Sequence, residues 1–229
     1  MRTLLPSIVL FGMMMAHAGA AMAQEPPETL PIGPYVVDLR GSMPRLKADP
    51  VVAAAINLTP DNLPTRGRGY AVGAHWYPLR KGAVTLGLGG EWLVSQARRT
   101  LEPTTEGGEE GPTAIRDLTV VAPQVSVNFG KRQGWSYISG GVGYATLTAE
   151  READPRPADI IVIGTPLVES RLRPLTIVYG GGARWFLNRH IAVSMDLHFY
   201  RISPQAPGIV RPAMPGATLM VLSVGTAFK

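Results

Sequence analysis

The segment "IAVSMDLHFY", residues 191–200, alternates large apolar residues with small or polar ones. Side chains of a β-strand point alternately to its two faces, so this segment predicts a strand with one apolar face. That face carries Ile191, Val193, Met195, Leu197 and Phe199. A soluble protein would bury this face, whereas a membrane β-barrel would turn it toward lipid. The segment alone therefore does not show which of its two faces points inward.

Composition does not separate these two classes. The chain has 229 residues, 17% of them charged, and a mean hydropathy of +0.09, which fits a soluble globule or a barrel with half-apolar strands. The net charge of +5 is modest, and no Lys/Arg cluster with interleaved aromatic residues indicates nucleic-acid binding. Because cysteine is absent, disulfides, thiolate metal sites and cysteine nucleophiles are excluded.

The first residues have the pattern of an export signal. A basic start at Arg2 leads into an apolar stretch that ends with Ala21 and Ala23, small residues at the two positions that a signal peptidase inspects. The stretch is short for a membrane helix, which needs about 20 apolar residues, so an uncleaved anchor is the weaker alternative. We therefore predict a signal peptide at 1–23, a proline-rich periplasmic tether at 24–33 and one barrel domain at 34–229.

Eight strand-like segments follow, separated by connections of two kinds. The segments are 35–46, 68–79, 83–96, 115–129, 135–148, 172–187, 191–202 and 218–228. Short and long connections alternate strictly along the chain, with long connections first and last. In an antiparallel barrel, successive connections lie at opposite ends, so one end would collect short turns and both termini and the other would collect long loops. Helical periodicity is confined to "VVAAAINL" at 51–58.

These features together resemble the eight-stranded bacterial outer-membrane β-barrel proteins of the OmpA and OmpX type. The resemblance covers residues 34–229 and rests on the signal peptide, the eight segments, the sorting of loops and the aromatic-ended last strand "TLMVLSVGTAFK". It implies an all-β fold, an eight-stranded antiparallel up-and-down transmembrane β-barrel. Family members usually end on the phenylalanine that the assembly machinery is thought to read, whereas here Lys229 follows Phe228.

A barrel in lipid reverses the usual faces, so the polar side of each strand would line the interior. Nine residues form the predicted interior polar network: Asp38, Arg40, His75, Glu91, Gln124, Asn128, Arg184, Asp196 and His198. Five aromatic residues are predicted to face lipid or the interfacial girdle: Trp76, Trp92, Trp185, Phe199 and Phe228. Since buried charges must be paired, we expect salt bridges among the interior residues.

Aromatic and glycine positions extend this interpretation. Trp135 and Phe186 fall near the short-turn ends and are expected in the same interfacial girdle. Glycines such as Gly89 and Gly182 fall on inward faces, where a narrow barrel needs small neighbours for long side chains. The glycine-rich runs lie within strand patterns and lead into no helix, which disfavours a phosphate-binding loop.

No residue pattern predicts catalysis, a cofactor or a metal. Ser194, Asp196 and His198 share one face, but neighbours at this spacing are about 6.6 Å apart and Asp196 separates the other two. His75 and His198 lie on distant segments without metal-ligand spacing. The acidic stretch 102–110 lacks the alternating pattern of a calcium loop, although its glutamates could contact lipopolysaccharide through divalent cations.

The sequence therefore predicts a non-enzymatic structural or surface-interaction barrel in the bacterial outer membrane, with a polar, largely filled interior and long extracellular loops. The alternatives are a narrow channel or small-solute carrier, a lipid-modifying enzyme, and a soluble periplasmic lipocalin-like binder. The expected partners are outer-membrane lipid and lipopolysaccharide, the barrel assembly machinery, and an extracellular ligand that the sequence does not identify. Nucleic acid is not expected as a partner.

Overall fold

The structure is a computed structural model that describes residues 33–102, 111–130, 134–152, 168–169, 174–205 and 215–229. The predicted signal peptide and nearly all of the predicted tether lie outside the described residues, as does most of the acidic stretch 102–110.

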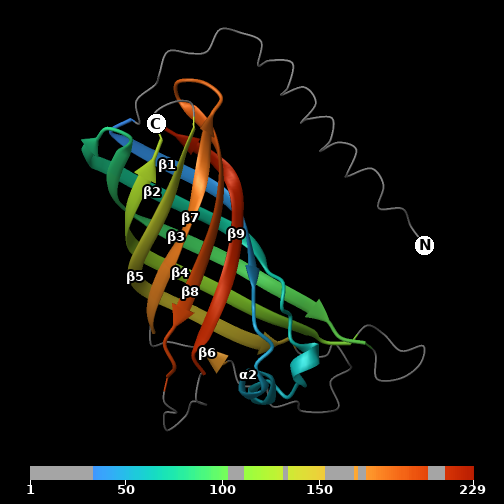
Figure 1. The fold of residues 1–229 in the computed structure, drawn as a ribbon. Coiled ribbons are helices and arrows are strands. Elements are labelled where there is room, and N and C mark those ends of the chain that lie inside the picture. Colours follow the sequence, from blue (N-terminus) through green and yellow to red (C-terminus); the bar gives the residue numbers. More distant parts are fainter. Residues whose placement is uncertain (1–32, 103–110, 131–133, 153–167, 170–173, 206–214) are drawn as a thin grey trace, which may run out of the picture.

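Eight long antiparallel strands close into a barrel (Figure 1). They are β1 (Tyr35–Arg45), β2 (Arg68–Lys81), β3 (Val84–Thr100), β4 (Thr113–Phe129), β5 (Gly134–Arg151), β7 (Leu175–Phe186), β8 (Ile191–Ile202) and β9 (Ala217–Phe228). Each strand pairs with the next, and β9 pairs with β1 to complete the circuit. The two-residue strand β6 (Val168–Glu169) adds to the outer part of β5. The predicted eight-stranded up-and-down barrel is confirmed.

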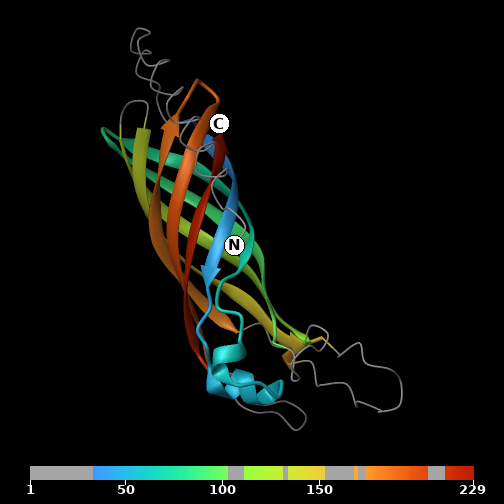
Figure 2. The same cartoon turned by 90° about the vertical axis from the view of Figure 1, so that its right-hand side faces the viewer.

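Strand boundaries differ from the predicted ones mainly at one end of the barrel. β8 has the predicted bounds, whereas β3 runs four residues further, to Thr100, and β5 three further, to Arg151. The reason is continued pairing, because β3 and β4 stay in register out to Thr100 and Thr113. Sequence alternation is weaker there and does not predict these extensions. As a result β3, β4 and β5 project beyond the other strands (Figure 2).

The two ends of the barrel carry different connections. Turns between β2 and β3, β4 and β5, and β7 and β8 lie at one end, where Lys229 N–H donates to the His190 carbonyl and Tyr77 N–H to the Pro34 carbonyl. The opposite end carries the longer connections. The first of these contains the helix α2 (Pro50–Ala55) and the 3-10 turn η2 (Pro60–Asn62). Asp49 caps α2 by accepting from Val51 N–H at 2.9 Å, and the expected helical stretch is found here.

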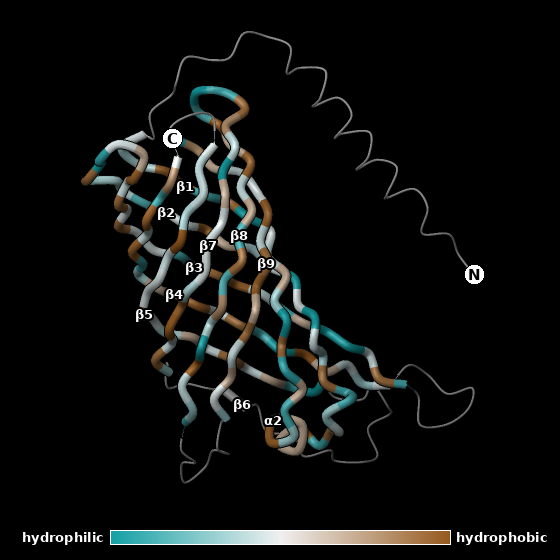
Figure 3. The backbone as a smooth tube through the Cα atoms, in the orientation of Figure 1, coloured by the Kyte–Doolittle hydropathy of each residue, from teal (hydrophilic) through white to brown (hydrophobic). Residues whose placement is uncertain are grey.

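Outward-facing side chains form an apolar belt around the barrel, and the tube in Figure 3 alternates hydrophobic and hydrophilic residues along each strand. The belt includes four of the five predicted lipid-facing residues, Trp76, Trp92, Trp185 and Phe228, as exposed side chains, with Phe199 partly exposed. Register explains the belt, because paired outward positions such as Val72 and Trp92 lie side by side. Nothing in the described chain covers this surface.

The interior has three layers rather than one polar core. At the short-turn end, Trp135 and Phe186 stack with ring centroids 4.7 Å apart. Both are buried, at 3% and 2% exposure, so the expectation that they belong to the girdle is wrong. Trp185 faces outward, and because adjacent strand residues face opposite sides, Phe186 must face inward. Charged residues occupy the middle layer. Apolar residues fill the layer beyond it, among them Leu93, Leu118, Val120, Leu147 and Leu219.

Candidate functional site

The nine predicted interior residues are all buried, with exposures from 0% to 6%. The structure does not, however, join them into a single network. Six of them take part in ion pairs: Asp38, Arg40, Glu91, Arg184, Asp196 and His198. The remaining three are His75, Gln124 and Asn128.

One ion pair joins β1 and β7. Arg184 Nε donates to Asp38 Oδ1 at 2.9 Å, and Arg184 Nη2 donates to Asp38 Oδ2 at 2.7 Å. This parallel geometry satisfies both carboxylate oxygens. The Arg184 guanidinium also lies 4.3 Å from the centre of the Tyr137 ring, a cation–π contact.

A second cluster surrounds Arg40. Its Nη2 donates to Glu91 Oε2 at 2.5 Å, and its Nη1 donates to Asp196. Tyr200 donates its hydroxyl proton to Glu91, and Tyr137 donates its own to Asp196. One guanidinium therefore binds two carboxylates, from β3 and β8, and two phenols supply further donors to those carboxylates.

The other three predicted residues form no ion pair among the described residues. Asn128 donates to the Thr85 carbonyl at 3.2 Å and to Ser126 Oγ at 3.1 Å. Neither ring nitrogen of His75, nor the Gln124 amide nitrogen, has a hydrogen-bond partner within the described residues. His75 instead stacks on Tyr77, with ring centroids 6.4 Å apart.

Sequence reasoning missed the tyrosines and serine that complete the cluster. Tyr137 and Ser139 alternate with outward residues along β5, so strand parity could have placed them inside. Tyr200 follows the same rule on β8, in phase with Asp196 and His198. Residue type alone does not identify an interior tyrosine, because a tyrosine in a barrel sequence is equally typical of the interfacial girdle.

The possible catalytic residues are arranged differently from the sequence order. Ser194 is buried, and its hydroxyl has no hydrogen-bond partner within the described residues. His198 Nε2 instead lies 3.0 Å from Ser139 Oγ, and its Nδ1 lies 3.5 Å from Glu91 Oε2. This serine–histidine–carboxylate order is the one that hydrolases use, although Glu91 is also held by Arg40 and Tyr200.

A structured cap covers the end with long connections. Three arginines of the barrel wall donate to carbonyls of the β1–β2 connection: Arg99 to Asp61, Arg116 to Lys47 at 2.9 Å, and Arg151 to Asn57 at 3.5 Å. Below these contacts Val52, Ala53, Ile56 and Leu63 pack with Ala149 of β5. The cap is thus fixed by both hydrogen bonds and apolar burial.

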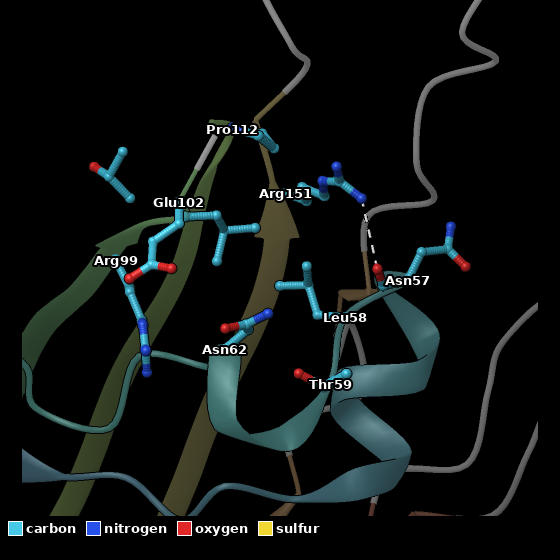
Figure 4. A pocket seen from close by; sticks show the side chains of 10 residues that line it. Asn57, Leu58, Thr59, Asn62, Arg99, Glu102, Pro112 and Arg151 are labelled. Atoms are coloured by element: carbon cyan, nitrogen blue, oxygen red, sulfur yellow. Dashed lines mark hydrogen bonds between the residues drawn. The ribbon is translucent and has the colours of Figure 1, made fainter. Parts of the chain in front are cut away.

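A pocket of about 680 Å³ opens between this cap and the ends of β3, β4 and β5 (Figure 4). Its lining is mostly polar and comprises Asn57, Leu58, Thr59, Asn62, Arg99, Thr100, Leu101, Glu102, Pro112 and Arg151. Two guanidinium groups, two amides and two hydroxyls offer hydrogen-bond donors, and Glu102 adds one carboxylate. Such a mixture suits a small, hydroxyl-rich or anionic ligand.

No group of three or more histidine and acidic side chains within the described ranges is placed to hold a metal ion. Among the described helices, none has the length and apolarity needed to cross a membrane.

Solved structures provide the comparison with known proteins. Surface protein A of Neisseria (NspA) aligns with a TM-score of 0.54 over 86% of this chain and 97% of its own, at 10% sequence identity. The chain has the fold of an outer-membrane β-barrel. Ail, the attachment invasion locus protein of Yersinia pestis, aligns with a TM-score of 0.46 at 10% identity, over 85% of this chain and 95% of its own. The outer membrane protease OmpT from Escherichia coli aligns with a TM-score of 0.42 at 9% identity, over 88% and 99%.

No protein-family model matches the chain, and no curated protein matches it in sequence. At these identities the structural likeness shows the fold of this barrel and not its activity.

Proposed function

We propose that this outer-membrane barrel is a non-enzymatic surface-interaction protein that binds an extracellular ligand at its capped mouth. The observation that carries the proposal is the cap, in which three barrel arginines fix the β1–β2 connection beside a polar pocket. Ordering a loop costs conformational entropy, so a cap held this firmly presents a preformed surface. NspA, one neighbour with the same fold, is itself a surface protein.

The packing of side chains in the interior favours a closed barrel rather than a channel. An eight-stranded barrel has an interior just wide enough for side chains to fill it. Here the stacked rings of Trp135 and Phe186, the ion pairs and the apolar layer succeed one another along the axis. A solute would have to displace all three, which disfavours the channel alternative.

The proposed setting is the bacterial outer membrane, reached by export and by insertion through the barrel assembly machinery. The exposed apolar belt supports this setting, because a soluble protein rarely leaves so wide a band of Trp, Leu, Val and Phe uncovered. The partners we propose are the surrounding lipid and lipopolysaccharide, with the extracellular ligand as the third.

The experiment combines location with binding. Cells that express the chain are fractionated, and the barrel is identified by a band that shifts on boiling. Surface exposure is measured by labelling an epitope inserted at residue 106, and a glycan and peptide array is then screened with the folded barrel. Binding should weaken in Arg151→Gln and persist in Arg189→Gln, which removes a cation from the opposite end. Recovery in the soluble periplasm would overturn the proposal.

A second candidate function is hydrolysis, because Ser139, His198 and Glu91 have the order of a catalytic triad. The three side chains are buried at mid-barrel, so a substrate carbonyl would need a path that the surrounding side chains now occupy. A fluorophosphonate probe separates the two candidates. Labelling that disappears in Ser139→Ala would favour the enzyme, whereas the surface-interaction proposal expects no labelling.

A further inference from the structure

Exposed cations gather on one arc of the barrel, just beyond the apolar belt. The outer basic patch consists of Arg45, Lys47, Arg66, Arg68 and Arg98. All five are exposed. Arg45, Arg68 and Arg98 lie on β1, β2 and β3, which are neighbours in the sheet, and Lys47 and Arg66 lie in the connection between β1 and β2. The patch points away from the barrel axis and is therefore separate from the pocket beside the cap.

The patch begins where the belt ends. On β2, the outward residues Trp76, Ala74, Val72 and Tyr70 lead to Arg68. On β3, Trp92 and Val94 lead through Gln96 to Arg98. Tyr70 and Trp92 are in edge-to-face contact directly below the patch, with ring centroids 5.8 Å apart. Aromatic pairs of this kind lie at the boundary between lipid and water, which places the patch at headgroup level.

Like charges face one another inside the patch. Arg45 and Arg66 are direct backbone partners across the strand pair, and Arg68 lies two residues from Arg66 on the same face. Direct pairing of like charges destabilises a sheet unless a counter-charge is present. None of Arg45, Lys47, Arg66 and Arg68 forms an ion pair with an acidic residue of the described chain.

One acidic group beside the patch on β4 is already engaged. Asp117 on β4 accepts from Gln96 Nε2 at 2.8 Å, and Gln96 Oε1 accepts from Arg98 Nε at 2.5 Å. Further round the barrel, Asp117 on β4 and Thr148 on β5 lie in register with Arg68 and Gln96, and Glu150 on β5 lies in register with Arg98 through Ile115. Within the described residues, four of the five patch cations therefore have no acidic partner, and an anion from outside can supply the counter-charge.

We propose that the outer basic patch binds the phosphate groups of a phosphorylated glycolipid in the outer leaflet. Guanidinium groups bind phosphate through paired hydrogen bonds, and cations at headgroup level attract anionic lipid. A lipid is favoured over a soluble anion because the patch is continuous with the belt, so acyl chains can lie on Met43, Tyr70 and Trp92 while the phosphates meet Arg45, Arg66 and Arg68. The inference rests on the proposed membrane location and names the lipid contact within it.

The test measures lipid retention by the whole mature barrel. The chain is folded into phosphatidylcholine bilayers that contain lipid A with two phosphates, or the same lipid A after its phosphates are removed. Native mass spectrometry counts the lipid A molecules bound per barrel as their concentration is raised. Arg45→Gln/Arg68→Gln is compared with the matched variant Lys81→Gln/Arg189→Gln, which removes two exposed cations from the opposite end. The boiling-dependent band shift verifies folding of both variants.

The wild type should retain phosphorylated lipid A, and the patch variant should need about tenfold more lipid for the same occupancy, with the control within about twofold of wild type. Equal retention of dephosphorylated lipid A, or equal losses in the two variants, would overturn the inference. Tighter binding of a soluble sulfated glycan than of lipid A would do the same. If the wild type inserts into phosphatidylcholine but shows no preference for lipid A, only this inference fails; if it inserts into no bilayer, the proposed function fails as well.

Discussion

Arg184 on β7 and Asp38 on β1 form a two-point ion pair inside the barrel, although 146 positions separate them in the chain. Their side chains are 1% and 0% exposed. The two strands are not neighbours in the sheet, because β8 and β9 lie between them. The pair therefore links opposite parts of the wall through the interior, where each charge depends on the other.

Arg184→Met should lower the free energy of unfolding by about 3–5 kcal/mol, because Asp38 would be left buried without its cation. Urea unfolding in lipid vesicles, followed by tryptophan emission, measures the loss. Asp38→Asn/Arg184→Met, which removes both charges, should recover part of it. If the double variant were less stable than the single one, uncompensated charge would be the wrong explanation. Arg189→Met, in an exposed turn, serves as the neutral control.

Gly182→Ala should destabilise the barrel by about 1–3 kcal/mol through overpacking. A Cβ atom at this position would overlap Asp196 Oδ1 and lie 2.5 Å from the Met195 carbonyl oxygen, which is backbone and cannot give way. At Gly140 the nearest atom to an added Cβ is 3.8 Å away, so Gly140→Ala should be nearly neutral. The temperature of the boiling-dependent band shift compares the two variants, and equal shifts would refute the packing argument.

Trp135→Ala should open the short-turn end of the interior. Removing a buried ring of this size costs about 3–5 kcal/mol and leaves Phe186 without its stacking partner. We expect little ion current from the wild type in planar bilayers and a measurable current from this variant. Trp76→Ala removes an outward ring that is 57% exposed and should leave the current unchanged. A wild type that already conducts would favour the channel alternative.

Arg116→Met should loosen the cap. The Arg116 guanidinium donates to the Lys47 carbonyl at 2.9 Å and to the Pro64 carbonyl at 3.5 Å, at the two ends of the segment that carries α2 and η2. Losing a charged donor to buried carbonyls costs about 1–3 kcal/mol, so amides of α2 should exchange with solvent faster. Hydrogen exchange followed by mass spectrometry reads this segment directly. Arg98→Met, whose side chain faces outward, should leave the exchange unchanged.

Local sequence patterns predicted most of the fold. Alternation over 191–202 gave a strand with the observed bounds, and the stretch at 51–58 gave the position of α2. The face was wrong for Trp135 and Phe186 because they were assigned by residue type, whereas parity with the outward Trp185 places Phe186 inside. The pocket at the capped end was harder to predict, since its lining comes from two strands and two connections whose proximity no local pattern encodes.

The sequence by itself determined the number of strands, the face on which each side chain lies and the sorting of turns, because all three follow from a period of two and from connection lengths. Only the tertiary structure decided which buried residues meet. Arg40 reaches Asp196 across 156 positions, whereas the ring nitrogens of His75 and the amide nitrogen of Gln124 are also buried but have no hydrogen-bond partner among the described residues. Alternation determines whether a side chain faces the inside or the outside of the barrel. Its height and angular position depend on the stagger accumulated over all eight strands.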